Sequence, residues 1–110
     1  MYAYKERYTL DFSKIERWGD FHQIIKDELD FPNYYGENWD ALWDCLSEMV
    51  DDEEKLNIEI FGVENLEKRL PGASEMLFKI FKRLKYIDEK EFYHMIRIEI
   101  VVGEARYEIY

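Results

Sequence analysis

The spacing of apolar residues along the chain predicts strands that alternate with helices. Apolar and polar residues alternate over 8–12, 56–60 and 96–102, which is the period of a strand with one buried face. Elsewhere apolar residues recur every three or four positions, as in amphipathic helices, over four segments: 20–29, 40–51, 63–70 and 73–86. The predicted order is strand, helix, helix, strand, short helix, helix and strand.

Turn and capping residues set the ends of these elements. Asp20 with Gln23 has the spacing of a capping box and predicts a helix start at Asp20. Pro32 and Pro71-Gly72 end helices. Gly103-Glu104 fits a two-residue turn, after which 105–110 return as an antiparallel edge strand. The pattern also predicts residues that face the core in the last helix and in this final strand: Met76, Leu77, Ile80, Phe81, Leu84, Tyr107 and Ile109.

Helical crossovers between strands imply a parallel sheet. The strands alternate instead of being apolar throughout, so we expect the helices mainly on one face. No repeat, low-complexity segment or Pro/Gly/Ser linker divides the sequence. We therefore predict a single α/β domain over 1–110. Its small three-stranded parallel sheet has one helix layer and an extra C-terminal antiparallel hairpin strand.

Composition and charge narrow the choice of partner. The chain of 110 residues is 47% hydrophobic and 17% aromatic, enough for a folded core, and its formal net charge is −10. This field repels nucleic acids and membrane surfaces and attracts basic partners. The single Cys45 fits a reducing compartment and a buried core position. With no signal-peptide pattern and no apolar run of membrane-spanning length, we expect a cytoplasmic protein.

The segment 32–46 carries the strongest functional signal. It opens as a loop, where we expect Gly36 to permit the turn, and continues as a helix with an apolar face of Leu42, Cys45, Leu46 and Met49. The opposite face holds Asp40, Asp44, Ser47 and Asp51, with Trp39, Trp43 and Val50 along one border.

Two interpretations of this acidic face compete. For an arbitrary charged stripe, a solvated surface is favoured by roughly three to one. Large aromatics beside charges, however, are typical of binding hot spots. Core packing could account for either Trp39 or Trp43 but hardly for both, so the aromatic border favours binding.

Enzyme motifs are absent from the sequence: there is no phosphate loop, paired-cysteine zinc spacing, nucleophile elbow or calcium loop. We read His22 as a partly buried helix histidine. A metal-assisted hydrolase using Glu37, Asp40, Asp44 and His94 is conceivable, because two carboxylates on one helix turn can share an ion. Paired acids on helix surfaces are common, so this alternative ranks well below binding, and we expect no metal and no cofactor.

At this segment the sequence resembles the barstar family of intracellular ribonuclease inhibitors. The resemblance covers about a quarter of the chain. The matching residues are His22, Lys26, Glu28, Leu29, Pro32, Tyr34-Tyr35-Gly36-Glu37-Asn38 and Asp40-Ala41-Leu42-Trp43-Asp44-Cys45-Leu46.

The resemblance implies the barstar fold and a stoichiometric inhibitor, not an enzyme, that blocks the basic cleft of a microbial ribonuclease. It implies that Asp40 and Asp44 meet cationic groups of the nuclease, that Tyr34 and Trp43 supply aromatic contacts, and that the loop approaches closely at Gly36 and Asn38. With their neighbours on the helix, the expected partner-binding residues are Tyr34, Gly36, Asn38, Trp39, Asp40, Trp43, Asp44, Ser47 and Asp51. We expect a monomer.

Three departures from the family pattern qualify this expectation. The last long helix reads Lys79-Ile80-Phe81-Lys82-Arg83, where the family has an acidic contact, and Trp39 replaces a smaller aliphatic residue. Ser47-Glu48-Met49 stands where the family has Gly and Trp. These changes predict a different or diverged nuclease. The runner-up is a binding or regulatory module of the same fold whose basic partner is not a nuclease.

Overall fold

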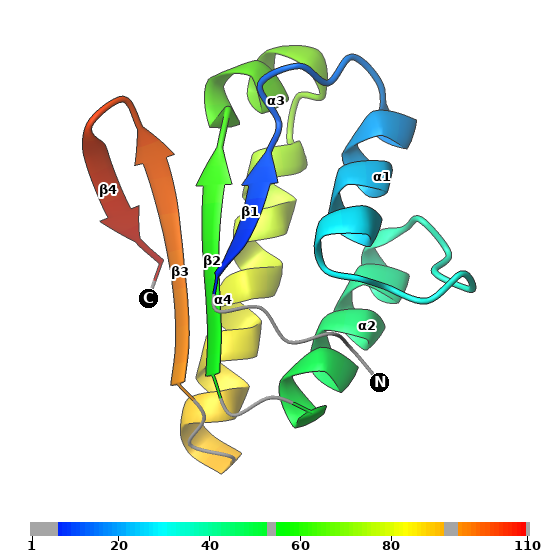
Figure 1. Cartoon of the computed structure of the whole chain (residues 1–110), viewed down its shortest axis with the longest axis vertical. Coiled ribbons are helices and arrows are strands. Elements are labelled where there is room, and N and C mark those ends of the chain that lie inside the picture. The colour runs from blue at the N-terminus through cyan, green and yellow to red at the C-terminus, as the bar shows by residue number, and fades with distance from the viewer. Residues whose placement is uncertain (1–6, 53–54, 92–94, 110) are drawn as a thin grey trace.

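The computed structural model describes residues 7–52, 55–91 and 95–109, and its elements alternate as the apolar spacing predicts (Figure 1). The described elements are β1 (Tyr8–Asp11), α1 (Trp18–Glu28), α2 (Trp39–Asp52), β2 (Lys55–Phe61), α3 (Val63–Arg69), α4 (Ala73–Glu91), β3 (Met95–Val102) and β4 (Ala105–Glu108).

The four strands form one sheet in the order β1-β2-β3-β4. β1 pairs with β2, and β2 with β3, in parallel, because a helical crossover separates each pair. The two-residue turn at Gly103, where φ is 59°, brings β4 back antiparallel to β3, with Val102 opposite Ala105. The predicted parallel sheet and the extra hairpin strand are confirmed.

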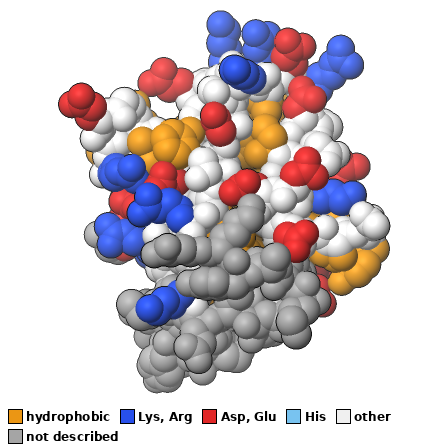
Figure 2. Space-filling model, in the orientation of Figure 1, with side chains coloured by type: hydrophobic (Ala, Val, Ile, Leu, Met, Phe, Trp, Pro, Cys, Tyr) orange, Lys and Arg blue, Asp and Glu red, His pale blue; other side chains and the backbone are white. Residues whose placement is uncertain are grey.

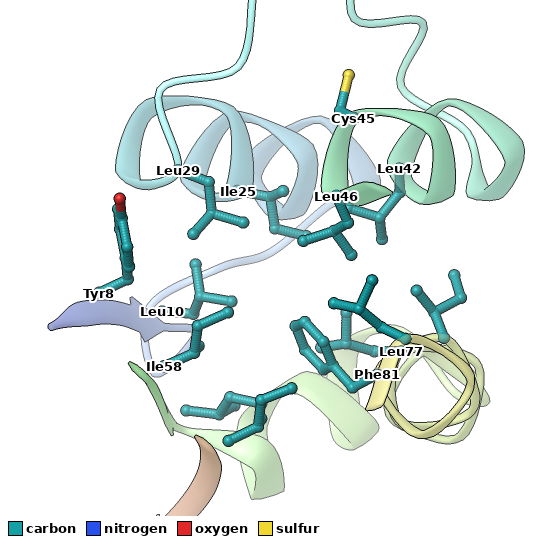
Figure 3. Packing of buried hydrophobic residues seen from close by; sticks show 14 of the residues in the cluster. Tyr8, Leu10, Ile25, Leu29, Leu42, Cys45, Leu46, Ile58, Leu77 and Phe81 are labelled. Carbon is teal, nitrogen blue, oxygen red and sulfur yellow. The ribbon is translucent and has the colours of Figure 1, made fainter. Parts of the chain in front are cut away.

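The hydrophobic core lies between one face of the sheet and the helices (Figure 3). Side chains of the sheet, of α1, of α2 and of α4 converge there and are completely buried: Leu10, Ile58, Ile25, Leu29, Leu42, Leu46, Leu77 and Phe81. Burying a side chain of this size contributes about 1.5–3 kcal/mol. Among the described helices, none is both long and apolar enough to cross a membrane.

The other face of the sheet carries charge. Glu59 and Glu99 are neighbours across β2 and β3 and are only 4% and 8% exposed. Arg7 lies 2.8 Å from the carboxylate of Glu59, and Arg106 lies 3.4 Å from Glu59 and 3.8 Å from Glu99. The arginines keep much of their surface in solvent while they neutralise the two acids, which is how buried charges are normally accommodated.

Several expectations about individual residues are wrong. Asp20 is not the residue before the helix: α1 begins at Trp18, and the Asp20 carboxylate accepts hydrogen bonds from the backbone N–H groups of Glu16 and Arg17. Met76 is 37% exposed and Tyr107 is 59% exposed, so neither is a core residue, whereas Ile109 is buried as predicted. α4 also continues five residues beyond the predicted end, since no proline or glycine interrupts it.

A close backbone contact joins the turn after β2 to the loop after β1. Gly62 has a φ of 74°, and a Cβ atom there would lie 2.3 Å from the backbone nitrogen of Ser13. The Asn65 side chain donates hydrogen bonds to the carbonyls of Phe12 and Ile15 at 2.8 and 3.1 Å, which fixes the same loop. This contact requires glycine, for both conformation and space.

We expect Gly62→Ala to lower the free energy of unfolding by at least about 3 kcal/mol, because the methyl group adds a backbone clash to the left-handed strain. Gly72→Ala is the matched control: φ is 88° there, but nothing lies within 4 Å of its added Cβ. The control therefore loses only about 1–2 kcal/mol. Urea unfolding of both variants measures the difference, and equal losses would contradict the close contact.

Candidate functional site on the exposed face of α2

Asn38 starts α2 as its N-cap. Its side-chain oxygen accepts a hydrogen bond from the Ala41 N–H at 2.8 Å, and its backbone carbonyl accepts the first helical bond, from Leu42, at 2.9 Å. Its amide nitrogen also donates to the carbonyl of Gly36 at 3.2 Å. Asn38 thus fixes both the helix start and the preceding loop, a structural role that the sequence analysis missed although asparagine is a preferred capping residue.

The loop residue with a positive φ is Glu37, not Gly36. Glu37 has a φ of 51°, whereas Gly36 is not among the residues of positive φ. A Cβ at Gly36 would make contacts of 3.4 Å with Ala41 and Asn38, which are near ordinary packing distances. The expectation that Gly36 permits the turn is therefore wrong. Its close approach to a partner stays a prediction.

The carboxylates of Asp40 and Asp44 lie on the exposed face of α2. Within the described residues neither has a hydrogen bond or ion pair from its side chain. Ser47, one turn further, is half-buried and its hydroxyl donates to the Trp43 carbonyl at 2.9 Å. Asp51 lies in the last turn of α2, but its side chain is outside the described part. The structure thus presents two neighbouring acids without partners among the described residues.

Both tryptophans at the border of this face pack against the core, so the expectation that only one could do so is wrong. Trp39 meets Trp18 and Phe21 edge-on, with ring centroids 5.8 and 5.6 Å apart. Trp43 lies under the guanidinium of Arg83, which is 4.0 Å from the ring centroid. Each indole is half-buried, and each is followed in the sequence by an exposed aspartate, Asp40 or Asp44.

Tyr34 precedes α2 and is 73% exposed. Its hydroxyl donates a hydrogen bond to Glu48 of α2 at 3.3 Å. Desolvation and the Glu48 carboxylate raise the pKa of this phenol, so it stays neutral near neutral pH. A large, exposed aromatic held against the helix is a common component of protein interfaces.

A buried hydrogen bond joins α1 to the loop before α2. The ring nitrogen Nδ1 of His22 and the hydroxyl of Tyr35 are 2.7 Å apart, and the two residues are only 6% exposed. Burial lowers the pKa of His22, although the nearby Glu37 opposes the shift, and burial raises the pKa of Tyr35. His22 is the buried helix histidine that the sequence predicts, and it connects α1 to the loop that carries Tyr34.

Within the described residues, the alternative of a metal-assisted hydrolase finds no cluster of ligands. No three His, Cys, Asp or Glu residues within the described ranges lie where they could hold a metal ion together. His94, which that hypothesis requires, lies outside the described residues. Cys45 is buried, and desolvation raises the pKa of its thiol, so it is not an activated nucleophile.

The sequence analysis did not predict two residues that lie beside the site, Trp18 and Arg83. Trp18 is 43% exposed and packs beside Trp39, which extends the aromatic surface from α2 onto α1. Arg83 of α4 covers Trp43 and places a cation beside the acidic face. Neither contact is local in sequence, so only the packing of α1 and α4 against α2 reveals them. The sequence shows that the helix around Arg83 is basic, but it does not show that Arg83 stacks on Trp43.

Comparison with known proteins identifies the family. Residues 6–99 match the family described as Barstar (barnase inhibitor), and the chain belongs to this family. The match ends at residue 99 and leaves β4 outside. The chain is also similar to the "Putative ribonuclease inhibitor YrdF" of Bacillus subtilis (strain 168), with 58% identity over 41 residues. That segment spans 37% of this chain and 42% of the relative, less than half of either.

We expect Asn38→Ala to destabilise the protein by about 1 kcal/mol, because it removes the bond to the Ala41 N–H. Asn38→Asp keeps a capping acceptor and serves as the matched variant. Thermal or urea unfolding separates the two. Equal stability of Asn38→Ala and the wild-type protein would contradict the capping role.

Stability should also fall in mild acid because of His22. Histidine in the unfolded chain takes up a proton near its usual pKa of 6.5, whereas folded His22 does so only at lower pH. Its contribution is therefore fully present above pH 6.5 and is lost as the pH falls through 6.5 toward the folded pKa. Urea unfolding between about pH 5 and 7.5 measures this loss.

His22→Gln is the control for this pH dependence, because it keeps a polar partner for Tyr35 but does not titrate in this range. The acid-induced loss should shrink in the variant relative to the wild-type protein. The same loss in both proteins would assign the effect to other groups.

Proposed function

We propose that this protein inhibits a microbial ribonuclease by placing the exposed face of α2 and its preceding loop in the basic active-site cleft. The observation that carries the proposal is the pair of carboxylates, Asp40 and Asp44, which have no partner among the described residues and stand on a helix whose other side is buried. Membership of the barstar family supports a ribonuclease as the target. The protein would act as a stoichiometric inhibitor in the cytoplasm of its producer.

The chemistry of a ribonuclease cleft favours this mode of binding. A site that binds RNA phosphates presents arginine, lysine or histidine, and carboxylates can replace phosphate oxygens as acceptors of charge-assisted hydrogen bonds. Asp40 and Asp44 would accept these bonds. The loop would approach the cleft at Gly36 and Asn38, and the remaining partner-binding positions would be Ser47 and Asp51.

Aromatic side chains would exclude water from these charge pairs. Tyr34 stands on the loop side, and Trp39 and Trp43 border the acidic face. Removing water strengthens an ion pair that is well matched, and surrounding contacts of this kind are typical of hot spots. Only the exposed parts of the indoles are available for this contact, because their other surfaces pack against the core.

The net charge of −10 adds long-range attraction to a basic enzyme. Such steering raises association rates by roughly 10- to 1,000-fold at low salt and weakens as salt increases. It acts on the encounter of the two proteins, whereas Asp40 and Asp44 act on the stability of the complex.

A second candidate function is binding of a basic partner that is not a nuclease. The observation that favours it is the cationic character of α4 beside the site, where Arg83 stacks on Trp43 and the resemblance implies an acidic contact. Arg83 would repel a cleft that is lined only by cations. The partner, whether nuclease or not, should therefore offer an acidic or neutral group opposite Arg83. RNA-cleaving activity in the partner separates the two functions.

The test is calorimetric or surface binding to barnase, or to another guanyl-preferring microbial ribonuclease, with RNA cleavage measured in parallel. We expect stoichiometric binding that abolishes cleavage and weakens with salt. Asp40→Asn with Asp44→Asn should weaken it at least about 100-fold, because each loss leaves a cation of the nuclease unpaired. The general magnitude of such losses was established partly on the barnase–barstar complex itself.

A matched variant separates local contacts from overall charge. Glu64→Gln with Glu104→Gln removes the same two charges from exposed positions elsewhere and should change affinity by less than about tenfold. Equal weakening by both double variants would reject the specific role of Asp40 and Asp44. Tight binding that leaves RNA cleavage intact would reject active-site inhibition and favour the second function.

A further inference from the structure

The two edges of the sheet differ in how they are covered. At the β1 edge, the backbone N–H of Thr9 donates a hydrogen bond of 2.9 Å to the carboxylate of Glu28, and α1 packs beside the strand. At the other edge, β4 is the last strand of the sheet, and none of the described elements lies beyond it (Figure 1). An open edge presents unpaired backbone groups that can pair with another strand.

The hairpin register shows which backbone groups of β4 do not pair with β3. In a two-residue hairpin the residues that flank the turn, Val102 and Ala105, form a hydrogen-bonded pair, and such pairs recur at every second residue. The Ile109 N–H bonds the Ile98 carbonyl at 2.8 Å, in agreement with this pattern. Ala105 and Tyr107 therefore direct their backbone groups toward β3. Arg106 and Glu108 direct theirs outward.

The side chains of β4 are complementary to those of a second β4. In an antiparallel pair that places Arg106 opposite Glu108 of the second copy, each outward residue exchanges two backbone hydrogen bonds with its opposite. The symmetry of a homodimer repeats this arrangement, so both arginines face glutamates. Sliding the copies by two residues in either direction would instead place Arg106 opposite Arg106, or Glu108 opposite Glu108, which is unfavourable.

In the complementary register, Tyr107 lies on the two-fold axis, opposite Tyr107 of the second copy. The two tyrosines share the face of the sheet that Arg106 and Glu108 do not occupy. Tyr107 is 59% exposed, and Val102 on the same face is 41% exposed, although both are large apolar residues. Aromatic pairs across antiparallel strands are favourable. Pairing of two β4 strands would therefore cover apolar surface that the monomer leaves in solvent.

The edge is also attached to α4 and carries charges of both signs. Lys85 of α4 donates to the carbonyl of Ile109 at 2.5 Å and lies 3.4 Å from Glu108, so the end of β4 is fixed to the helix layer. Arg97 lies 3.6 Å from the Glu108 carboxylate. Figure 2 shows acidic and basic side chains intermixed on the side of the molecule where β3 and β4 lie. The strong negative charge of the chain is thus locally balanced where two copies would meet.

We propose that two copies of this chain associate by antiparallel pairing of their β4 strands, with Arg106 opposite Glu108 and Tyr107 on the two-fold axis, to form a continuous eight-stranded sheet. The pairing uses the strand that lies beyond the family match. In Figure 1 this edge lies across the molecule from α2, so the acidic face of each copy stays accessible. The sequence analysis expected a monomer, and the open, self-complementary edge argues against that expectation. Because the paired strands are short, the association should be weak and dependent on concentration.

Hydrogen exchange of the wild-type chain, measured by NMR over a wide range of protein concentration, tests the proposal without a variant. The N–H groups of Arg106 and Glu108 should become at least about tenfold more protected as concentration rises. Tyr107 and Ile109 are the internal controls, because their N–H groups bond β3 in monomer and dimer alike. Protection of Arg106 and Glu108 that does not change with concentration would overturn the proposal, as would protection that appears only when a ribonuclease is added.

Disulfide formation tests the register. In a Cys45→Ala background, Tyr107→Cys should form a covalent dimer in a glutathione redox buffer, because opposed residues of a non-hydrogen-bonded pair are about 4.5 Å apart at Cα, within disulfide range. Ala105→Cys is the control: the two copies of this position would be roughly 13 Å apart along the strands. We expect Tyr107→Cys to cross-link at least about ten times faster. Circular dichroism checks that both variants are folded. Equal cross-linking rates of the two folded variants would overturn the register.

Discussion

The packing of the apolar side of α2 fixes the orientation of Asp40 and Asp44. Leu42, Leu46 and Met49 are completely buried against the core, so the helix cannot rotate without exposing them. The Asn38 cap fixes the first turn, and the His22–Tyr35 hydrogen bond supports the loop before it. The backbone positions of Asp40 and Asp44 are therefore fixed by the packing of the chain itself. Such preorganisation lowers the entropy cost of binding.

The acidic residues of the sheet have ion-pair partners, whereas those on the exposed face of α2 do not within the described residues. Glu59 and Glu99 on the sheet lie within ion-pair distance of arginines, as their burial requires. Asp40 and Asp44 have no such partner among the described residues, although Arg83 stacks on the neighbouring Trp43. An exposed carboxylate loses little by remaining solvated, but two neighbours on one helix face repel each other. The acidic face is thus a feature that folding alone does not explain.

The sequence predicts those features that depend on local periodicity. The apolar face of α2, the order of the elements and the turn at Gly103 follow from spacing and turn chemistry, and all are present. The packing of both Trp39 and Trp43 was not predicted, because an indole is wide enough to cover the core and still reach the surface. That contact depends on α1 and α4, which lie far away in sequence.

Other errors arose where two local rules compete. Glycine usually takes the positive φ of a turn, yet here Glu37 adopts it, while Asn38 immediately caps the helix. Asp20 has the chemistry of an N-cap residue, but its carboxylate instead bonds the backbone N–H groups that precede it. Tyr107 lies on the predicted face of its strand, but alternation cannot tell whether a helix covers that face at the sheet edge.

The two edges of the sheet place different demands on the sequence. β1 lies next to α1, so a single carboxylate, Glu28, can bond its outward N–H. β4 lies across the molecule from α1 and α2 (Figure 1), and among the described residues no side chain accepts a hydrogen bond from the N–H groups of Arg106 and Glu108. A charged, short strand is one way to discourage pairing with arbitrary partners. Because Arg106 and Glu108 carry opposite charges two residues apart, the same charges that discourage a misaligned copy favour one aligned on Tyr107.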